Sequence, residues 1–377
     1  MNVLLTVNAA WNVRNFRWPV VRALQERGDT VTVLAPPDDS VPAMVAEGVR
    51  FVPLAMRQEA LGPLDNLKVL AQLHRRFGEL RPDVVLSYTI KNNLFGALAA
   101  RARGIPFIPN VSGLGTAFLS GGGLRLVSEA LYRAAFARLP VVFFQNPDDR
   151  ALFVARKLVA AQAARLLPGS GIDPVRFAVA PLPPLPPTFL MIARLLRDKG
   201  VGEYLEAARI VRRTHPEARF RLLGGRADDH RSALDPMLLE GAVARGDIEY
   251  LGSTDDVRPH VAAAHFVVLP SYREGAPRTL IEGAAMARPL IASDVPGCRE
   301  IVDAPQTGLL CEARSAESLA GAVRAALALP PDEWVRMGLL GRDKMLREYD
   351  EKLVIDAYLT AIGRVTGRFG GPGAGAA

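Results

Sequence analysis

Short apolar runs alternate with longer amphipathic stretches along residues 1–180. The amphipathic stretches carry apolar residues three and four positions apart, the spacing of a helix with one buried face. This alternation predicts βαβ units and a parallel sheet. The expected strands are Val3–Val7, Val31–Leu34, Phe51–Leu54, Val84–Leu86, Phe107–Ile108 and Val141–Phe144. The expected helices are Arg17–Arg27, Leu67–Leu80, Leu94–Arg103, Leu124–Arg138 and Asp148–Val159.

A proline-rich segment interrupts this pattern, and the alternation then begins again. Residues 178–187, AVAPLPPLPP, contain five prolines and suit neither a helix interior nor a central strand, so they predict a linker. The expected strands after it are Phe189–Ala193, Arg219–Leu223, Ile248–Leu251, Phe266–Leu269, Leu290–Ala292 and Gly308–Cys311. We therefore expect two doubly wound α/β domains that face one cleft.

The domain boundaries follow from the linker and from the end of the chain. The first domain is predicted at residues 1–180 and the second at residues 181–348. An amphipathic segment at 349–366 is expected to form a helix that packs back towards the first domain. The Gly- and Ala-rich residues 367–377 are expected to be disordered.

Two glutamates stand eight positions apart at a strand-to-helix junction of the second domain. The apolar run Phe266–Leu269 predicts a buried strand, and Pro277 suits the first position of the next helix. Glu274 is then expected in the loop at the strand's carboxyl end, where open α/β sheets bind ligands, and Glu282 in the helix. Free N–H groups at the helix start suit a phosphate. The pair suggests a sugar nucleotide site, with an ordinary loop glutamate and helical glutamate as the alternative.

Two cations follow the first strand of the second domain. The strand Phe189–Ala193 leads into a loop that carries Arg194 and Lys199. Arg is a planar, permanently charged fork and Lys is a mobile point charge, so together they suit a diphosphate whose leaving oxygen gains charge. Two surface cations on a loop before a helix are the alternative.

Length and composition narrow the class of protein. The 377 residues fit two domains of ordinary size. No apolar run approaches the roughly 18 to 20 residues of a membrane-spanning helix, and the N-terminal MNVLLTVNAAWNVRNF lacks the features of a signal peptide. Cys298 and Cys311 offer no disulfide framework. These features predict a cytoplasmic protein.

The net charge of +7 belongs to the first half of the chain. Residues 1–180 hold 21 Lys and Arg against 13 Asp and Glu, whereas the remainder holds 25 against 26. A basic half suits nucleic acid, anionic lipid or a phosphorylated substrate, and a general bias towards arginine is the alternative. No nucleic-acid recognition motif accompanies the charge, so we expect no nucleic-acid partner.

The sequence offers no metal centre and no activated nucleophile. It contains no Asp-x-Asp, and no His and Cys cluster has zinc spacing. Gly-Ser-Gly at 169–171 lacks the nucleophile-elbow spacing, and there is no Walker loop or G-x-G-x-x-G. We expect neither a bound metal nor an obligatory cofactor.

Four motifs span nearly all of residues 188–325. They are ARLLRDKG, the Gly224-Gly225 pair, LPSYREGAPRTLIEGAAMARPLIASDVPGCREIV and GLLCEARSAESLA. Together these motifs closely resemble family 4 glycosyltransferases, which have the GT-B fold. The family transfers sugars from nucleotide diphosphate donors with retention of anomeric configuration. The resemblance implies that Glu274 contacts the donor sugar, that Glu282 contacts the ribose, and that Arg194 and Lys199 hold the diphosphate. The remaining residues that we expect at the donor are Gly225, Gly275, Ala276, Arg278, Thr279 and Leu280.

The first half narrows the resemblance to the bacterial branch that builds lipid-linked oligosaccharides and cell-surface polysaccharides. Its motifs are WNVRNFRWPVVRAL, PDVVLSYTIKNNLFGALAARARGIP, NVSGLGTAF, FFQNPDDR and LLPGSGIDPVRF. The resemblance implies that an acceptor would be bordered by Asn15, Arg17, Lys91, Asn92, Gly113 and Gly115. Lys91 and Asn92 are equally compatible with a helix N-terminus capped by Asn92.

This chain departs from the family pattern at two places, and there the roles of the family's residues cannot be assigned to it. Many members have a glycine pair in the first strand-to-helix loop, where this chain has Ala9-Ala10-Trp11-Asn12. Many also place a histidine of the first domain near the sugar. None of His74, His215, His230, His260 and His265 falls in a cleft loop expected for that domain, so no histidine is assigned a role.

The expected activity is that of a retaining hexosyltransferase. It would move a sugar from a nucleotide diphosphate sugar, such as a UDP-sugar, to a lipid-linked or glycan acceptor, with the leaving phosphate taking the acceptor's proton. The stretch Leu124–Arg138 suits peripheral contact with an anionic membrane on its cytoplasmic face, and an ordinary packed helix is the alternative. A non-hydrolysing sugar nucleotide epimerase and a catalytically silent sugar-nucleotide-binding subunit are the competing functions.

Overall fold

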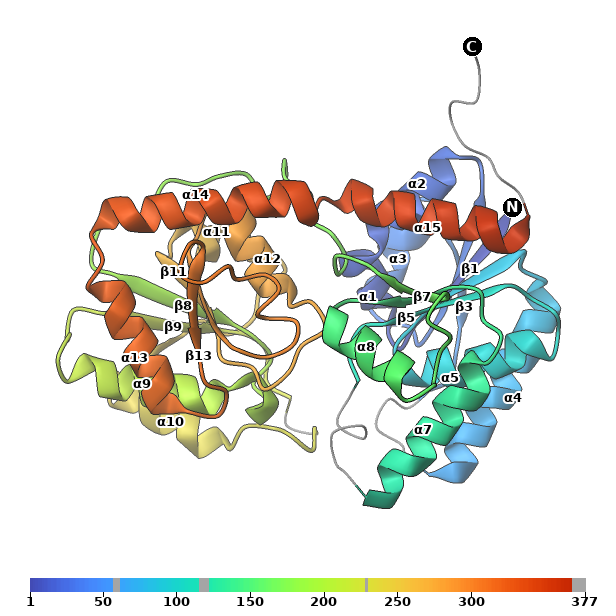
Figure 1. Ribbon diagram of the computed structural model, residues 1–377, viewed down its shortest axis with the longest axis horizontal. Helices are drawn as coiled ribbons and strands as arrows, with labels where there is room; N and C mark the ends of the chain where they lie inside the picture. The colour runs from blue at the N-terminus through green and yellow to red at the C-terminus, as the bar shows by residue number, and fades with distance from the viewer. Residues whose placement is uncertain (57–61, 115–121, 228–229, 368–377) are drawn as a thin grey trace, which may run out of the picture. The chain divides into compact units, whose positions relative to one another are not determined.

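A computed structural model describes residues 1–56, 62–114, 122–227 and 230–367 (Figure 1). The chain forms two compact units. The first consists of residues 1–170 with the C-terminal helix, and the second of residues 171–350. Each unit contains one sheet whose paired strands are all parallel. The predicted doubly wound α/β fold class is therefore confirmed; the tail predicted to be disordered lies, from residue 368, outside the described residues.

The first unit is built on a seven-stranded sheet in the order β3-β2-β1-β4-β5-β6-β7. Its strands are β1 (Asn2–Thr6), β2 (Thr30–Ala35), β3 (Arg50–Pro53), β4 (Val84–Tyr88), β5 (Phe107–Val111), β6 (Val142–Phe144) and β7 (Ala164–Leu166). Its described helices are α1 (Ala10–Phe16), α2 (Trp18–Glu26), α3 (Val41–Ala46), α4 (Pro63–Leu80), α5 (Ile90–Arg101), α7 (Gly122–Phe136), α8 (Pro147–Ala155) and α15 (Glu351–Thr366). The short edge strand β7, with two of three residues exposed, has no apolar signal in the sequence.

Separate apolar layers cover the two faces of this sheet. Phe77, Phe95 and Phe136 lie on the face covered by α4, α5 and α7. The other face packs against α1, α2 and α15, and the last of these contributes Tyr358 and Ile362 to the core. The strands are therefore buried on both sides, which explains their nearly continuous apolar runs.

The predicted helix Arg17–Arg27 is confirmed as α2, but a further short helix, α1, precedes it. The chain breaks between these two helices at Arg17, which has φ −125° and ψ 0°. Pro19 explains the break, because proline lacks an N–H and its ring clashes with the carbonyl four residues earlier in a continuous helix. Arg17 is consequently held at a bend between two short helices.

The second unit is built on a six-stranded sheet in the order β10-β9-β8-β11-β12-β13. Its strands are β8 (Thr188–Ile192), β9 (Arg219–Leu223), β10 (Glu249–Tyr250), β11 (Phe266–Leu269), β12 (Leu290–Ser293) and β13 (Gly308–Cys311). Its helices are the 3-10 turn η1 (Arg197–Lys199), α9 (Val201–Arg212), α10 (Pro236–Ala244), α11 (Arg258–Ala262), α12 (Arg278–Ala285), α13 (Ala316–Leu327) and α14 (Pro331–Glu348). Every strand predicted after the linker is present.

Aromatic side chains fix the central strands of this sheet. Phe189 stacks on Phe220 and on Phe266, with ring centroids 5.2 and 5.1 Å apart. These three residues lie side by side on β8, β9 and β11. Stacking of this kind adds stability beyond the burial of apolar area, so the three strands that precede the predicted site loops form a rigid base.

Two arginines bind the start of the proline-rich segment and the residues before it to the second unit. Arg288 is buried, and its guanidinium donates to the carbonyls of Ala180 and Pro181. Arg342 donates to the carbonyls of Phe177 and Pro174. Residues 171–180, which precede the predicted boundary, are thereby part of the second unit.

Both sheets share one topological feature. In each, the first strand lies between the second and the fourth, so that β1 neighbours β4 and β8 neighbours β11. The chain therefore leaves each of these neighbouring pairs in opposite directions. In open α/β sheets ligands bind at such switch points, outside the carboxyl ends of the strands.

Two glycines let the loops at the second switch point pack closely. Gly200 has φ +74°, and a Cβ there would lie 2.0 Å from the carbonyl oxygen of Pro270, which directly follows β11. Gly297 has φ +88°, and a Cβ there would lie 2.6 Å from the carbonyl oxygen of Glu274. Only glycine permits both the backbone conformation and the close approach.

Replacing Gly200 with alanine is expected to destabilise the second unit by more than about 2 kcal/mol, because the methyl group meets backbone and the conformation is left-handed. Gly202→Ala is the matched control: it lies in α9 and its Cβ would meet open space. We expect this control to stabilise by up to about 1 kcal/mol. Urea unfolding of both variants measures the difference, and equal midpoints would contradict the packing role of Gly200.

Candidate functional site

The predicted donor-side residues follow three neighbouring strands. Arg194 and Lys199 follow β8, Gly225 follows β9, and Glu274 follows β11. The backbone links the first two loops, since Leu195 N–H donates to the Gly225 carbonyl at 3.1 Å. The side chain of Thr279 links the third, donating to the carbonyl of Ile192 at the end of β8. The fold therefore brings these loops to one edge of the sheet.

Lys199 and Glu274 form an ion pair across the switch point. Lys199 Nζ lies 2.5 Å from Glu274 Oε1, and the two side chains retain 28% and 11% of their exposure. An ammonium has three N–H donors, so Lys199 can hold Glu274 and still donate to a second anion. Arg194 differs: it is exposed, and no residue in the described chain accepts a hydrogen bond from its side chain.

The loop that carries Glu274 is supported by groups from three other segments. Tyr272 donates its hydroxyl to Glu203 Oε1 on α9 at 2.6 Å, and the Arg314 guanidinium lies 4.6 Å from the Tyr272 ring centre. Ser271 donates to the carbonyl of Asp198 in η1. These contacts hold the loop against the helix that follows Lys199.

A second ion pair lies in the first turns of α12. Arg278 Nε donates to Glu282 Oε1 at 2.6 Å, an i to i+4 contact, and the Glu282 side chain is only 11% exposed. Burial raises the pKa of Glu282, while the positive charges of Arg278 and Arg176 oppose that rise. No described residue donates to Oε2 of Glu282, so one carboxylate oxygen is held and the other is left for a ligand.

The start of α12 differs from the prediction in one respect. Pro277 is the N-cap residue and not the first helical residue, and its carbonyl accepts from the N–H of Leu280. The loop residues Gly275 and Ala276 lead directly into this N-terminus, which has no side-chain cap. An uncapped helix start presents N–H groups to an anion.

The predicted acceptor-side residues lie around the switch point of the first sheet. Lys91 and Asn92 are in the first turn of α5, directly after β4, and Gly113 follows β5 with φ +147°. Asn15 lies on α1 and donates to the Trp11 carbonyl, and Arg17 follows the same helix. Gly115 lies outside the described residues.

Asn92 does not cap α5. Thr89 holds the N-cap position, and Asn92 is fully buried. Its Nδ2 donates to Thr6 Oγ1 of β1 at 2.7 Å, and its Oδ1 accepts from Thr89 Oγ1 at 3.0 Å. The side chain thus ties β1 to α5 across the switch point. The sequence pattern could not reveal this contact because Thr6 is 86 residues away.

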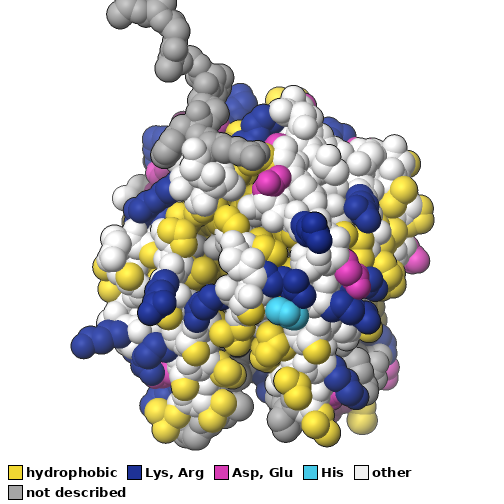
Figure 2. All heavy atoms as spheres, turned by 90° about the vertical axis from the view of Figure 1, so that its right-hand side faces the viewer, with side chains coloured by type: hydrophobic (Ala, Val, Ile, Leu, Met, Phe, Trp, Pro, Cys, Tyr) yellow, Lys and Arg dark blue, Asp and Glu magenta, His cyan; other side chains and the backbone are white. Residues whose placement is uncertain are grey.

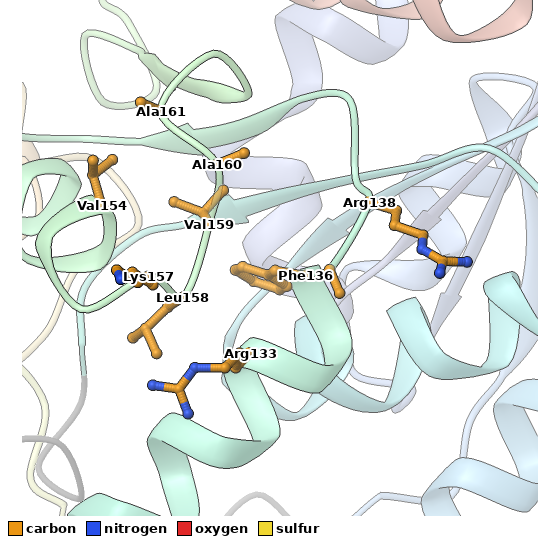
Figure 3. Close-up of a pocket in the computed structure, with 10 residues that line it drawn as sticks. Arg133, Phe136, Arg138, Val154, Lys157, Leu158, Val159, Ala160 and Ala161 are labelled. Carbon is orange, nitrogen blue, oxygen red and sulfur yellow. The ribbon is translucent and has the colours of Figure 1, made fainter.

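A pocket of about 470 Å³ in the first unit lies away from these residues (Figure 3). It is lined where α7 and α8 end, with Arg133, Arg138 and Lys157 around the apolar Phe136 and Leu158. In Figure 3 Arg138 points away from the other two cations. Cations near helix C-termini stabilise the terminal carbonyls, and helices of βαβ units end at the opposite edge from the strands' carboxyl ends. We therefore do not assign this pocket to the site.

The described residues offer neither a metal-binding cluster nor a membrane-spanning helix. No group of three or more His, Cys, Asp and Glu side chains is placed to hold a metal ion there. None of the helices in the described parts of the chain combines the length and the apolar composition needed to span a bilayer.

Sequence reasoning missed several residues that shape the site. Gly200 and Gly297 carried usable signals, because one follows the cationic loop and the other follows a proline, a turn dipeptide. Glu203 and Arg314 carried none, since each meets Tyr272 through the tertiary fold alone. The role of Arg278 as partner of Glu282 was readable from their four-residue spacing within a helix.

Comparison with known proteins agrees with this geometry. Residues 15–170 match the family model described as "Glycosyl transferase 4-like domain", and residues 186–328 match "Glycosyl transferases group 1". The chain is 28% identical to the N,N'-diacetylbacillosaminyl-diphospho-undecaprenol alpha-1,3-N-acetylgalactosaminyltransferase of Campylobacter jejuni, over 97% of this chain and 99% of that protein. It is 24% identical to the UDP-Gal:alpha-D-GlcNAc-diphosphoundecaprenol alpha-1,3-galactosyltransferase of Escherichia coli, over 76% and 75% of the two chains.

A solved structure extends the likeness to the whole fold. The sucrose-phosphate synthase of Thermosynechococcus elongatus superposes with a TM-score of 0.77 at 19% identity, covering 97% of this chain and 98% of that one. The two family matches, the relative that aligns along its full length and the two sheets with their switch points show that the chain is a family 4 glycosyltransferase with the GT-B fold.

Proposed function

We propose that this enzyme transfers a hexose from a UDP-sugar to a lipid-linked acceptor in bacterial cell-surface polysaccharide synthesis, with retention of configuration. The proposal rests on the two ion pairs at the second switch point, which join Lys199 to Glu274 and Arg278 to Glu282. The names of the Campylobacter and Escherichia coli relatives support the acceptor class, and the latter name supports the nucleotide.

In the proposed complex the second unit binds the donor. Lys199 and Arg194 hold the diphosphate together with the N-terminus of α12 that follows Gly275 and Ala276. Glu274 accepts hydrogen bonds from the hydroxyls of the transferred sugar, and Oε2 of Glu282 accepts from the ribose. Because Lys199 contacts Glu274 before any donor is bound, the cation and the sugar-binding carboxylate are oriented together.

The chemical step exchanges one bond at the anomeric carbon for another. The bond to the leaving phosphate oxygen breaks, the sugar passes through an oxocarbenium-like state, and the acceptor oxygen bonds to the same face. The acceptor's proton passes to the departing diphosphate. Both relatives are named for forming α-1,3 linkages, which is the product expected when an α-linked UDP-hexose reacts with retention. The charge that grows on the diphosphate is what Lys199 and Arg194 would stabilise.

Lys199→Ala is expected to lower kcat about 100- to 1,000-fold, because a preorganised charge that faces the leaving group is lost. Lys352→Ala, an exposed lysine of α15, is the control. The measurement is turnover of labelled sugar nucleotides with a membrane lipid extract. A wild-type rate for purified Lys199→Ala would refute the role of Lys199.

The same incubation separates the competing functions. A labelled glycolipid supports transfer, an epimerised donor identifies a sugar nucleotide epimerase, and binding without turnover identifies a silent sugar-nucleotide-binding subunit. A panel of UDP-hexoses, with the matching GDP- and ADP-sugars as controls, tests the nucleotide separately from the sugar. Glycolipid formation from a GDP-sugar in preference to every UDP-sugar would overturn the donor assignment while leaving the transfer reaction intact.

Arg278→Met is expected to make donor affinity depend on pH. The charges around Glu282 are Arg278 on its own helix, Arg176, and Asp256 with its partner Arg258. Without Arg278 the already raised pKa of Glu282 rises further, so a larger fraction of the carboxyl is protonated at a given pH and accepts fewer hydrogen bonds. We expect the donor KM to rise roughly tenfold at pH 7 and to fall again as rising pH ionises Glu282.

The control for this effect is the double variant with Glu282→Gln, whose amide does not titrate. A pH-dependent KM in Arg278→Met that persists in the double variant would show that another group titrates. Arg213→Met, an exposed arginine of the same unit, controls for the loss of one positive charge.

We further propose that the first unit docks on anionic membrane through the starts of α4 and α7. Leu64 and Leu67 of α4 and Leu126 and Val127 of α7 are each more than half exposed. Both helices pack on α5 and, as crossover helices, begin at the carboxyl edge of the sheet. Figure 2 shows hydrophobic side chains at the ends of two lobes of this unit, with Lys and Arg side chains around them. Apolar residues ringed by cations suit the interface of an anionic bilayer.

Vesicle flotation tests the docking surface. We expect the protein to float with vesicles that contain phosphatidylglycerol and not with phosphatidylcholine alone, and the double variant Leu126→Ser with Val127→Ser to lose most of this binding. Leu339→Ser, an exposed leucine of α14, is the control. Absence of binding at moderate salt would remove the proposal, and undiminished binding of the double variant would move the contact to another surface.

A further inference from the structure

Three cations are buried in the described chain, and their surroundings differ. Arg288 donates to the carbonyls of five residues. Lys344 pairs with Asp303 at 2.6 Å. Arg17, which is 7% exposed, has neither kind of partner: its Nη1 is fully covered without a hydrogen bond, and no carboxylate of the described residues forms an ion pair with it.

An aromatic ring holds this guanidinium in place. The Arg17 Cζ lies 4.4 Å from the centre of the Tyr88 ring, and the Tyr358 ring of α15 is 6.1 Å from that of Tyr88. Stacking on a ring fixes the plane of a guanidinium but accepts none of its N–H groups. A buried charge normally receives a counter-ion or hydrogen bonds, because desolvation without them is costly. The guanidinium N–H groups of Arg17 are therefore held in place by the ring, and no described residue accepts a hydrogen bond from them.

The position of Arg17 in the fold is that of a ligand contact. Tyr88 is the last residue of β4, which neighbours β1 at the switch point of the first sheet. Asn110, its partner on β5, donates to the Tyr358 hydroxyl at 2.9 Å. The guanidinium therefore lies at the carboxyl edge of the strands, which is the edge where sheets of this topology bind ligands.

We propose that Arg17 binds a phosphate group of the acceptor, an inference that rests on the proposed function. A permanently charged planar fork that lacks a carboxylate matches an anion with several oxygens, and phosphate is the anion that arginine binds in this bidentate way. The two relatives are named for acceptors joined to their lipid through a diphosphate. The net positive charge of the first unit favours the same ligand.

The same chemistry has a second source, the diphosphate of the donor. Steady-state kinetics distinguish the two when donor and acceptor are varied separately. For Arg17→Met we expect the acceptor KM to rise about tenfold or more and the donor KM to stay within twofold of wild type. Arg22→Met, an exposed arginine of α2, is the control. A donor KM that moves while the acceptor KM stays constant would overturn the assignment to the acceptor.

Thermal unfolding with and without inorganic pyrophosphate shows whether Arg17 has a binding role or a structural one. We expect Arg17→Met to unfold at the same temperature as wild type or higher, because it removes a buried charge that nothing compensates. We also expect it to lose part of the stabilisation that pyrophosphate gives wild type, and the double variant with Lys199→Ala to lose all of it. A lower unfolding temperature with an unchanged pyrophosphate effect would show that Arg17 is structural and would refute the proposal.

The two single variants also test the Arg17 site and the proposed donor site independently. If Lys199→Ala retains the full pyrophosphate effect while Arg17→Met loses it, the donor site fails and the Arg17 site stands. The converse leaves the donor site standing and overturns the Arg17 site. Should Arg17→Met fail to fold, Arg17→Lys is measured: it keeps the charge but not the fork, so its acceptor KM should rise, and a wild-type value would refute the proposal.

Discussion

Parallel strands that are covered on both faces leave only one place where polar chemistry can gather, the edge at which all strands end. In both sheets of this chain the order of strands reverses between the first and the fourth, so the loops after β1 and β4, and after β8 and β11, diverge and leave backbone and side chains accessible. The candidate donor and acceptor residues all depend on this constraint. They lie at strands that neighbour one another in space although they are far apart in sequence, as Lys199 and Glu274 are by 75 residues.

Charge is arranged differently at the two edges. At the second sheet each predicted carboxylate already has a cation, Glu274 with Lys199 and Glu282 with Arg278, so these four side chains are oriented and their charges balance, while Arg194 adds one positive charge. At the first sheet Arg17 is buried beside Tyr88 without a counter-ion. Ion pairs that are formed before binding suit a ligand that is recognised through sugar hydroxyls as well as phosphates, whereas a buried cation without a counter-ion suits a ligand that brings its own negative charge.

The sequence predicted what local patterns determine. The run FVVL at 266–269 is buried throughout, and the turn residues after it do place Glu274 in a loop and Glu282 on a helix. Local patterns could not predict contacts that depend on the order of strands in the sheet. Lys199 contacts Glu274 only because β8 and β11 are neighbours. A local signal was also missed, since Pro19 in the first turn of α2 separates this helix from α1 and leaves Arg17 at the bend between them. The burial of Asn92 followed from no pattern, because its partner Thr6 lies on β1, 86 residues away in sequence.

One criterion distinguishes structural from ligand-binding roles among the buried polar residues of the first unit. It is whether other residues of the fold already accept or donate their hydrogen bonds. The Asn92 amide hydrogen-bonds with Thr6 and Thr89, and Asn110 donates to Tyr358. These two side chains therefore join elements of the unit. Arg17 lies at the same edge and is also buried, yet the fold gives its Nη1 no acceptor. A group of this kind lowers the stability of the unit on its own, and such a cost persists where function requires the group. Under our proposal, the acceptor side is therefore better identified by a buried cation that the fold leaves without an acceptor than by the polar groups that cluster around it.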